Sequence, residues 1–270
     1  MNGVTPADPS RDPCMLPRQR LNLVFGGIAL LLVVSLSINL VLAMALHESF
    51  AKLQYSRVFP LGIAGANRPP IGNPATGRSI SFWGDSRSSM WDKAALGRDW
   101  LVHDFAHGGM TSSQLVLQLQ TQTLVRGQFT VVQVGINDLH PLGVLVAQKQ
   151  EVIERLRRNI LLVRDALLAR YDVVVLTTLF PPAHVPLVRR LAWDSDTLQY
   201  VRDFNEAVRQ AADGERVLLF DAHALLSEPD GYLSPRYVDE DFFLHVNRAA
   251  YARLNDQLRR LVEQHSLVRN

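Results

Sequence analysis

The sequence predicts an α/β protein, with a three-layer α/β/α sandwich around a mostly parallel five-stranded sheet and one N-terminal transmembrane helix. Three observations lead to this fold class. Short apolar runs rich in β-branched residues alternate with patterns of helical period, as in doubly wound parallel sheets. The 270-residue chain is 47% hydrophobic, which is enough for one substantial core. One long run near the N-terminus carries no charged residue.

That uncharged run covers residues 21–46, and its 26 residues exceed the roughly 20 that a helix needs to cross a bilayer. The alternative is a cleaved signal peptide, because Ala43-Met44-Ala45 resembles a small-x-small cleavage site. The apolar region of a signal peptide is normally only about 7–15 residues long, however. We therefore expect an uncleaved membrane anchor at residues 21–46.

Basic residues flank the anchor on both sides. Arg11, Arg18 and Arg20 precede it, and Lys52 and Arg57 follow it. The small excess before the run favours a cytoplasmic N-terminus, and so does the short length of the preceding tail. We expect a single-pass protein whose globular domain lies on the exoplasmic or periplasmic side.

The rest of the chain divides into three parts. Residues 1–20 show no periodicity and are predicted to be a disordered tail. Residues 47–78 are rich in proline and glycine, which is typical of a linker. The folded domain is expected to span residues 79–270, with no internal repeat.

Five apolar runs in this domain have the length and composition of strands. They are residues 79–83, 100–105, 129–135, 172–180 and 216–222. The clearest helical pattern covers residues 148–169, and a last helix is predicted at about 247–263. Strands separated by helices in this way form parallel sheets with helices on both faces.

Composition excludes several classes of function. Lys and Arg number 28 against 26 Asp and Glu, and no block of like charges occurs, so we expect no nucleic-acid partner. The single cysteine, Cys14, cannot form an internal disulfide and precedes the apolar run, where it is not a lipid attachment site. The histidines show no paired ligand spacing, so we predict neither a metal site nor a cofactor. No pattern specifies an oligomeric state.

Polar motifs follow the first three predicted strands. They are Gly84-Asp85-Ser86, the glycine turn from His107 to Thr111, and Gly135-Ile136-Asn137-Asp138. Because ligands bind beyond the carboxyl ends of parallel strands, these motifs are expected to meet at one edge of the sheet. A fourth motif, Asp241 to His245, stands ahead of the last helix.

Together these motifs supply the groups that acyl transfer to a serine requires. Ser86 would be the nucleophile, His245 the base that takes its proton, and Asp241 the group that orients the imidazole. The N–H groups of Ser86 and Gly109 and the side-chain amide of Asn137 could bind the developing oxyanion.

The set of motifs resembles the SGNH hydrolases, also called GDSL esterases and lipases, over about residues 79–263. The resemblance places the functional Ser, Gly, Asn and His of that family on Ser86, Gly109, Asn137 and His245. It implies a serine esterase that hydrolyses acetyl or short acyl esters of a small molecule or a glycan through an acyl-enzyme. Two alternatives remain open, an O-acyltransferase that modifies an envelope glycan and a catalytically silent binding module.

The chain departs from the family pattern at two positions. Arg87 stands where the family usually has leucine, and we expect its charge near the mouth of the site. The family's acid normally precedes the histidine by three residues, where this chain has Phe242. Asp241 would still reach His245 on a helical turn. If the segment is extended, Asp239 could take the role, and a backbone carbonyl is the third possibility.

Overall fold

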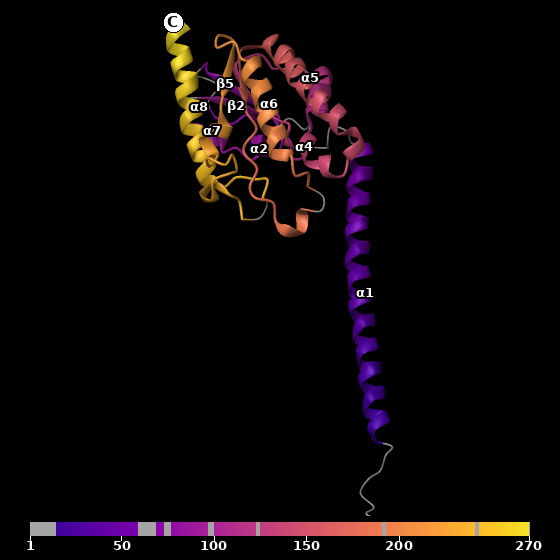
Figure 1. Cartoon of the computed structure of the whole chain (residues 1–270). Coiled ribbons are helices and arrows are strands. Elements are labelled where there is room, and N and C mark those ends of the chain that lie inside the picture. Colours follow the sequence, from indigo (N-terminus) through magenta and orange to yellow (C-terminus); the bar gives the residue numbers. More distant parts are fainter. Residues whose placement is uncertain are drawn as a thin grey trace, which may run out of the picture. The chain divides into compact units, whose positions relative to one another are not determined.

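The computed structural model describes residues 15–58, 69–72, 77–96, 100–122, 125–190, 193–240 and 243–269. The chain divides into two compact units, with the boundary between Val58 and Phe59. Figure 1 shows the long helix of the first unit and the layered second unit.

The first unit consists of one helix, α1 (Met15–Val58). The most apolar window of 18 residues within its segment Leu21–Leu53 has a mean hydropathy of 2.6, and none of that window is buried within the protein. At 1.5 Å per residue, these 33 residues exceed the roughly 30 Å thickness of a bilayer core. By length and composition α1 is able to span a membrane.

The helix is longer than the predicted anchor at both ends. Residues 15–20, expected in a disordered tail, and residues 47–58, expected in a linker, both belong to α1. The helix can continue into both flanks because residues 18–20 and 47–58 contain no proline or glycine. The remaining parts of those predictions, residues 1–14, 59–68 and 73–76, lie outside the described residues.

The second unit is built on a five-stranded sheet in which every neighbouring pair of strands is parallel. The spatial order is β2-β1-β3-β4-β5, so the chain starts near one edge of the sheet, adds β2 outside it, and then crosses to the other side. The five predicted strands are confirmed, with bounds β1 (Ser79–Gly84), β2 (Leu101–Asp104), β3 (Gly127–Gln133), β4 (Tyr171–Thr177) and β5 (Val217–Phe220).

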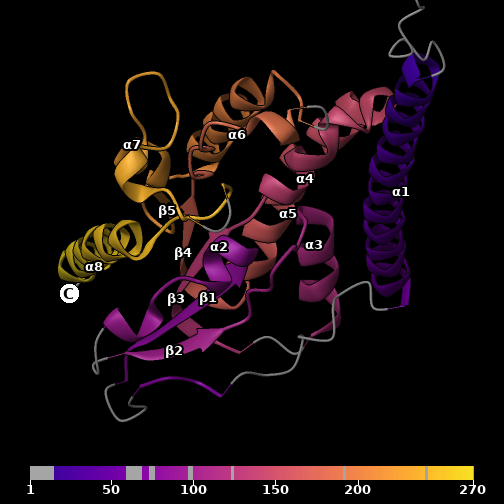
Figure 2. The same cartoon turned by 90° about the horizontal axis from the view of Figure 1, so that it is seen from below.

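Helices cover both faces of this sheet, as Figure 2 shows. One layer contains α3 (Ser112–Thr121), α5 (Lys149–Leu168) and α6 (Thr197–Ala211), and the other contains α7 (Ala222–Leu226) and α8 (Arg248–Arg269). The central strands are buried on both faces, since Phe82, Val131 and Val175 have no exposed surface. This is the predicted three-layer α/β/α sandwich.

Short elements fill the loops between these layers. Two one-turn helices, α2 (Ser86–Ser89) and α4 (Ile136–Leu139), follow β1 and β3 directly at their carboxyl ends. The 3₁₀ turns are η3 (Lys93–Leu96), η4 (His140–Gly143), η5 (Val146–Gln148), η6 (Leu187–Arg189) and η7 (Pro235–Tyr237). The elements that carry the polar motifs are therefore held by short connections to the most buried strands.

Candidate active site

The first motif forms a sharp turn from β1 into α2. The Asp85 side chain accepts a hydrogen bond from the Arg87 N–H at 2.9 Å and thereby caps α2. The turn requires glycine at position 84, where φ is +135° and an added Cβ would lie 1.8 Å from the Gln133 carbonyl oxygen. This close approach of β1 to β3 leaves Ser86 at the first position of α2, half-buried at the carboxyl edge of the sheet.

Backbone hydrogen bonds connect the neighbouring turns to this one. The Asp85 N–H donates to the Gln133 carbonyl at 3.0 Å, which connects the nucleophile turn to β3. On the other side, the His107 N–H donates to the Gly84 carbonyl at 2.9 Å. The ends of β1, β2 and β3 therefore meet where the sequence predicted that their motifs would converge.

The second and third motifs contact each other directly. Gly109 has a φ of +76° in an exposed turn, and Thr111 then caps α3 through a capping box with Gln114. The Asn137 amide donates to the Met110 carbonyl at 3.0 Å. An amide nitrogen carries two hydrogens, so this bond leaves a second donor on Asn137 beside the Gly109 turn.

Asp138 reinforces the same connection. Its carboxylate accepts from the Ser112 N–H at 2.9 Å and from the Ser112 hydroxyl at 2.7 Å. This partner is 26 residues away in the sequence, at the start of α3. Asp138 therefore fixes the distance between the glycine turn and Asn137.

The fourth motif brings the imidazole to the serine. His245 Nε2 lies 3.2 Å from Ser86 Oγ, across 159 residues of sequence. An antiparallel bridge between Val238 and Val246 closes the segment that carries His245, and the Asn247 side chain then caps the start of α8. The geometry suits proton transfer from the serine hydroxyl to a neutral imidazole.

The predicted acid, Asp241, and its neighbour Phe242 lie outside the described residues. The described residues that follow, 243–247, form a turn, a bend and a bridge. Asp239 is half-buried, and its charge raises the pKa of His245. Burial and the charge of Arg87 outweigh this effect, and the pKa of His245 is lowered.

Burial also dominates the titration of the two carboxyls beside the site. Burial raises the pKa of Asp85 to about 7, against the opposing charge of Arg87. It raises the pKa of Asp138 to about 6, against the hydrogen bonds from Ser112. Both side chains accept hydrogen bonds, Asp85 within its own turn and Asp138 from Ser112 at the start of α3.

Arg87 is not at the mouth of the site, contrary to expectation. Its side chain is 1% exposed and donates from Nε to the Leu244 carbonyl and from Nη1 to the Phe180 carbonyl. No sequence signal predicted these contacts, because the partners lie 157 and 93 residues away along the chain.

Sequence reasoning also missed a cluster of rings that includes Phe243, two residues before His245. The Trp193 ring lies 5.2 Å from that of Phe243 and 5.5 Å from that of His140, which follows α4. Trp193 also lines a cavity of about 300 Å³ together with Tyr232, His184, Arg190 and others. Only the fold brings these separate loops together.

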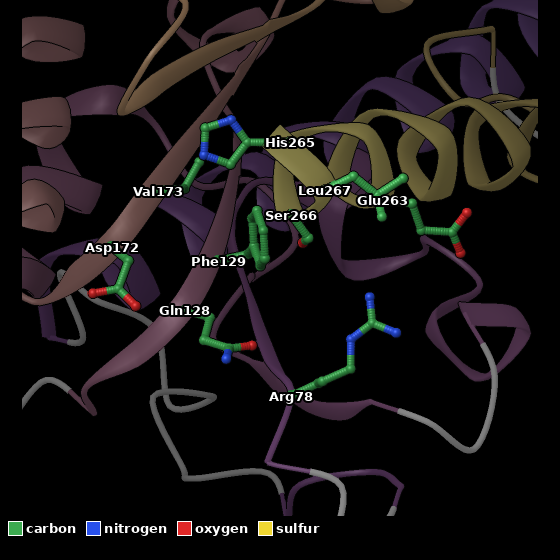
Figure 3. A pocket seen from close by; sticks show the side chains of 9 residues that line it. All are labelled: Arg78, Gln128, Phe129, Asp172, Val173, Glu263, His265, Ser266 and Leu267. Atoms are coloured by element: carbon green, nitrogen blue, oxygen red, sulfur yellow. The ribbon is translucent and has the colours of Figure 1, made fainter. Parts of the chain in front are cut away.

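A larger cavity, of about 770 Å³, lies at the amino ends of the strands, opposite the polar motifs (Figure 3). It is lined at the amino ends of the strands by Arg78, by Gln128 and Phe129, and by Asp172 and Val173. The motifs that follow the strands lie at their carboxyl ends, so this cavity is not part of the candidate active site.

The fold is of the α/β class, and a serine and a histidine are paired at the carboxyl ends of its strands. Residues 72–253 match the model of the GDSL-like lipase/acylhydrolase family, so the chain belongs to that family and is an SGNH-type ester hydrolase. No protein of curated function matches the chain in sequence. Within the described residues, no three or more His, Cys, Asp or Glu side chains are arranged to hold a metal ion.

Solved structures of similar fold include esterases. A GDSL-like lipase from Bacteroides thetaiotaomicron is 17% identical with a TM-score of 0.55, over 73% of this chain and 92% of that one. An acetylxylan esterase from Geobacillus stearothermophilus is 17% identical with a TM-score of 0.53, over 71% of this chain and 95% of that one. At this level of identity the likeness concerns the fold.

Proposed function

We propose that this protein is a serine esterase that hydrolyses acetyl or short acyl esters through an acyl-enzyme on Ser86. The observation that carries the proposal is the 3.2 Å contact between Ser86 Oγ and His245 Nε2 at the carboxyl edge of the sheet. A serine hydroxyl is a weak nucleophile by itself and needs a base at this distance to remove its proton.

In the proposed reaction, Ser86 Oγ attacks the ester carbonyl while His245 Nε2 takes its proton. The N–H groups of Ser86 and Gly109 and the second amide hydrogen of Asn137 bind the negative oxygen of the tetrahedral intermediate. His245 then returns the proton to the departing alcohol, which leaves Ser86 acylated. A water molecule, deprotonated by the same imidazole, releases the acid and restores the serine.

We assign the orientation of the His245 imidazole to Asp239. The positive charge that develops on the ring during attack is stabilised by a nearby carboxylate, and the charge of Asp239 already acts on this ring. Asp241 lies outside the described residues and stays a prediction, so its substitution is compared with that of Asp239.

Two observations support a small acyl group and a polar alcohol. The similar protein from Geobacillus stearothermophilus is an acetylxylan esterase. The 300 Å³ cavity, whose Trp193 contacts Phe243, combines the flat rings of Trp193 and Tyr232 with polar groups of Arg190 and Ser195. Aromatic faces and hydrogen-bonding groups together suit a hydroxylated, ring-shaped alcohol better than a long alkyl chain.

We further propose that α1 remains attached as a membrane anchor, with the hydrolase domain on the exoplasmic or periplasmic side. The length of the apolar segment, Leu21–Leu53, supports an anchor over a cleaved signal sequence.

The test of the nucleophile compares Ser86→Ala with Ser89→Ala, a serine on the same helix three residues later. The full-length protein in detergent is treated with a fluorophosphonate probe and assayed on p-nitrophenyl esters from C2 to C12. We expect Ser86→Ala to lose labelling and turnover and Ser89→Ala to retain both, with the highest kcat/KM at C2 to C4. Labelling of a folded Ser86→Ala protein would refute the assignment.

The test of the acid compares Asp239→Asn with Asp241→Asn. Loss of the orienting carboxylate can lower kcat by about 10⁴, so we expect a loss of this order for Asp239→Asn and only a few-fold change for Asp241→Asn. The reverse ranking would return the role to Asp241. Mild effects of both changes would indicate that a backbone carbonyl orients His245.

A further inference from the structure

Arg87 is a charged residue buried immediately after the proposed nucleophile. Its backbone is fixed from two sides, because its N–H donates to Asp85 and its carbonyl accepts from the Tyr251 hydroxyl, both at 2.9 Å. Its side chain is 1% exposed, although an unpaired charge is costly to remove from water. Two hydrogen bonds from its guanidinium, described below, offset part of this cost.

The Arg87 guanidinium connects three segments that are distant in sequence. Nε donates to the Leu244 carbonyl at 2.8 Å, and Nη1 donates to the Phe180 carbonyl, in the loop after β4, at 2.9 Å. The guanidinium carbon also lies 5.4 Å from the centre of the Phe180 ring. Only arginine presents several donors in a rigid plane, so lysine could replace the charge but not both bonds in this geometry.

The bond to Leu244 reaches the residue directly before His245. The antiparallel bridge between Val238 and Val246 holds the segment on the far side of the histidine. The Arg87 bond holds it on the near side, and it is anchored on the same one-turn helix as Ser86. The Arg87 side chain therefore connects the helix that carries Ser86 to the segment that carries His245.

Building on the proposed function, we propose that Arg87 is a positioning residue of the active site, whose guanidinium holds the Leu244 carbonyl and thereby keeps the His245 imidazole in hydrogen-bonding distance of Ser86 Oγ. It does not touch the reacting atoms, and its effect passes through His245.

The charge of Arg87 has a second consequence for the same imidazole. Among the described residues, two charged groups act on His245, Arg87 from α2 and Asp239 from the segment after η7. Arg87 lowers the pKa of His245 and Asp239 raises it. Loss of the guanidinium should therefore raise the pKa of His245 and move the acid limb of the rate profile to higher pH. Loss of a merely structural contact would not move this limb.

The experiment uses full-length protein in detergent, with Arg87→Met, Arg87→Lys and Tyr251→Phe. Met removes the charge and both side-chain bonds, Lys keeps the charge, and Phe removes only the bond to the Arg87 carbonyl. We expect Arg87→Met to lower kcat roughly 10- to 100-fold, the scale of a small displacement of a catalytic group, with a change in KM below about three-fold. Its acid limb should lie at higher pH than that of the wild type. Arg87→Lys should recover part of kcat and keep the wild-type limb, and Tyr251→Phe should lower kcat modestly without moving the limb.

A second readout does not depend on turnover. The pKa of His245 is measured by NMR on protein with labelled histidines, with the signal assigned by its loss in His245→Asn. A higher pKa in Arg87→Met than in wild type and Arg87→Lys supports the proposal even if every tested ester is a poor substrate, an outcome that would count against the proposed function alone. If Arg87→Met does not fold, the kcat and the acid limb of Arg87→Lys and Tyr251→Phe are compared with those of wild type to test the proposal.

Two results would overturn the proposal. The first is a folded Arg87→Met protein with kcat within two-fold of wild type and an unchanged His245 pKa. The second, which applies also when Arg87→Met cannot be purified, is an Arg87→Lys protein whose kcat equals that of wild type, because lysine cannot make both carbonyl bonds.

Discussion

The substitution Gly84→Ala tests the close approach of strands that places Ser86. An alanine Cβ at this position would lie 1.8 Å from the Gln133 carbonyl oxygen and 2.6 Å from its carbon. To reach even 3.0 Å from the oxygen, β1 and β3 must separate by at least about 1.2 Å, and no flexible side chain can absorb this shift because the contacted atoms are backbone. The same oxygen accepts the hydrogen bond from Asp85 N–H that holds the nucleophile turn.

Three costs add at this position. A non-glycine residue at positive φ costs about 1–3 kcal/mol, and a lost backbone hydrogen bond costs about 1 kcal/mol. Forcing apart two well-packed central strands costs about 1–3 kcal/mol more. We therefore expect Gly84→Ala to lower the free energy of unfolding by roughly 3–7 kcal/mol, a large fraction of the 5–15 kcal/mol typical of a domain.

Gly214→Ala is the matched control. Gly214 also has positive φ, at +77°, but an added Cβ would meet no atom within 4 Å, so only the conformational cost of about 1–3 kcal/mol remains. Denaturant unfolding of the full-length protein in detergent, followed by tryptophan fluorescence, compares the two, and all four tryptophans lie after residue 78. Gly84→Ala should also reduce kcat in any folded fraction. Equal unfolding free energies for the two variants, within about 1 kcal/mol, would refute the steric reasoning.

Three further predictions concern the site and the anchor. Asn137→Ala should lower kcat by roughly 10²–10³ with a smaller effect on KM, because one oxyanion donor is lost; a change confined to KM would make Asn137 a substrate-binding residue. The acid limb of kcat/KM, measured between pH 4.5 and 8, should have its midpoint below the ordinary histidine value of 6.5, because burial and Arg87 lower the pKa of His245 and the base must be neutral to act; a midpoint above 6.5 would contradict this. The full-length protein should stay in the membrane fraction, whereas an N-terminus at Leu46, found by sequencing the mature protein, would show cleavage after Ala45.

The site depends on a division of tasks between local turns and long-range contacts. The local turns present Ser86, Gly109 and Asn137 at the carboxyl ends of neighbouring strands. Backbone hydrogen bonds between those strand ends fix the positions of the turns relative to one another. His245 comes from a separate segment near the C-terminus, and only tertiary contacts bring it to the serine. Variants of the turns and variants of the His245 segment should therefore fail in different ways, the first in stability and oxyanion binding and the second in proton transfer.

The sequence by itself determined the features that arise from local patterns. Alternating apolar runs and helical periods specified the five strands and the layers around them, because burial on both faces of a parallel sheet requires continuous apolar strands. The Gly-Asp-Ser turn was readable because a tight strand-to-helix turn needs glycine, and the polar motifs after β1, β2 and β3 had to meet because parallel strands end at one edge.

Only the tertiary structure decided which groups surround His245. Arg87 looked like a charged residue at the mouth, yet it is buried against the carbonyls of Leu244 and Phe180, and the charge of Asp239 acts on the imidazole. Trp193 contacts the ring of Phe243, which stands two residues before His245. These neighbours come from loops without periodicity, whose paths are set by packing against distant segments, and no spacing in the sequence records such contacts.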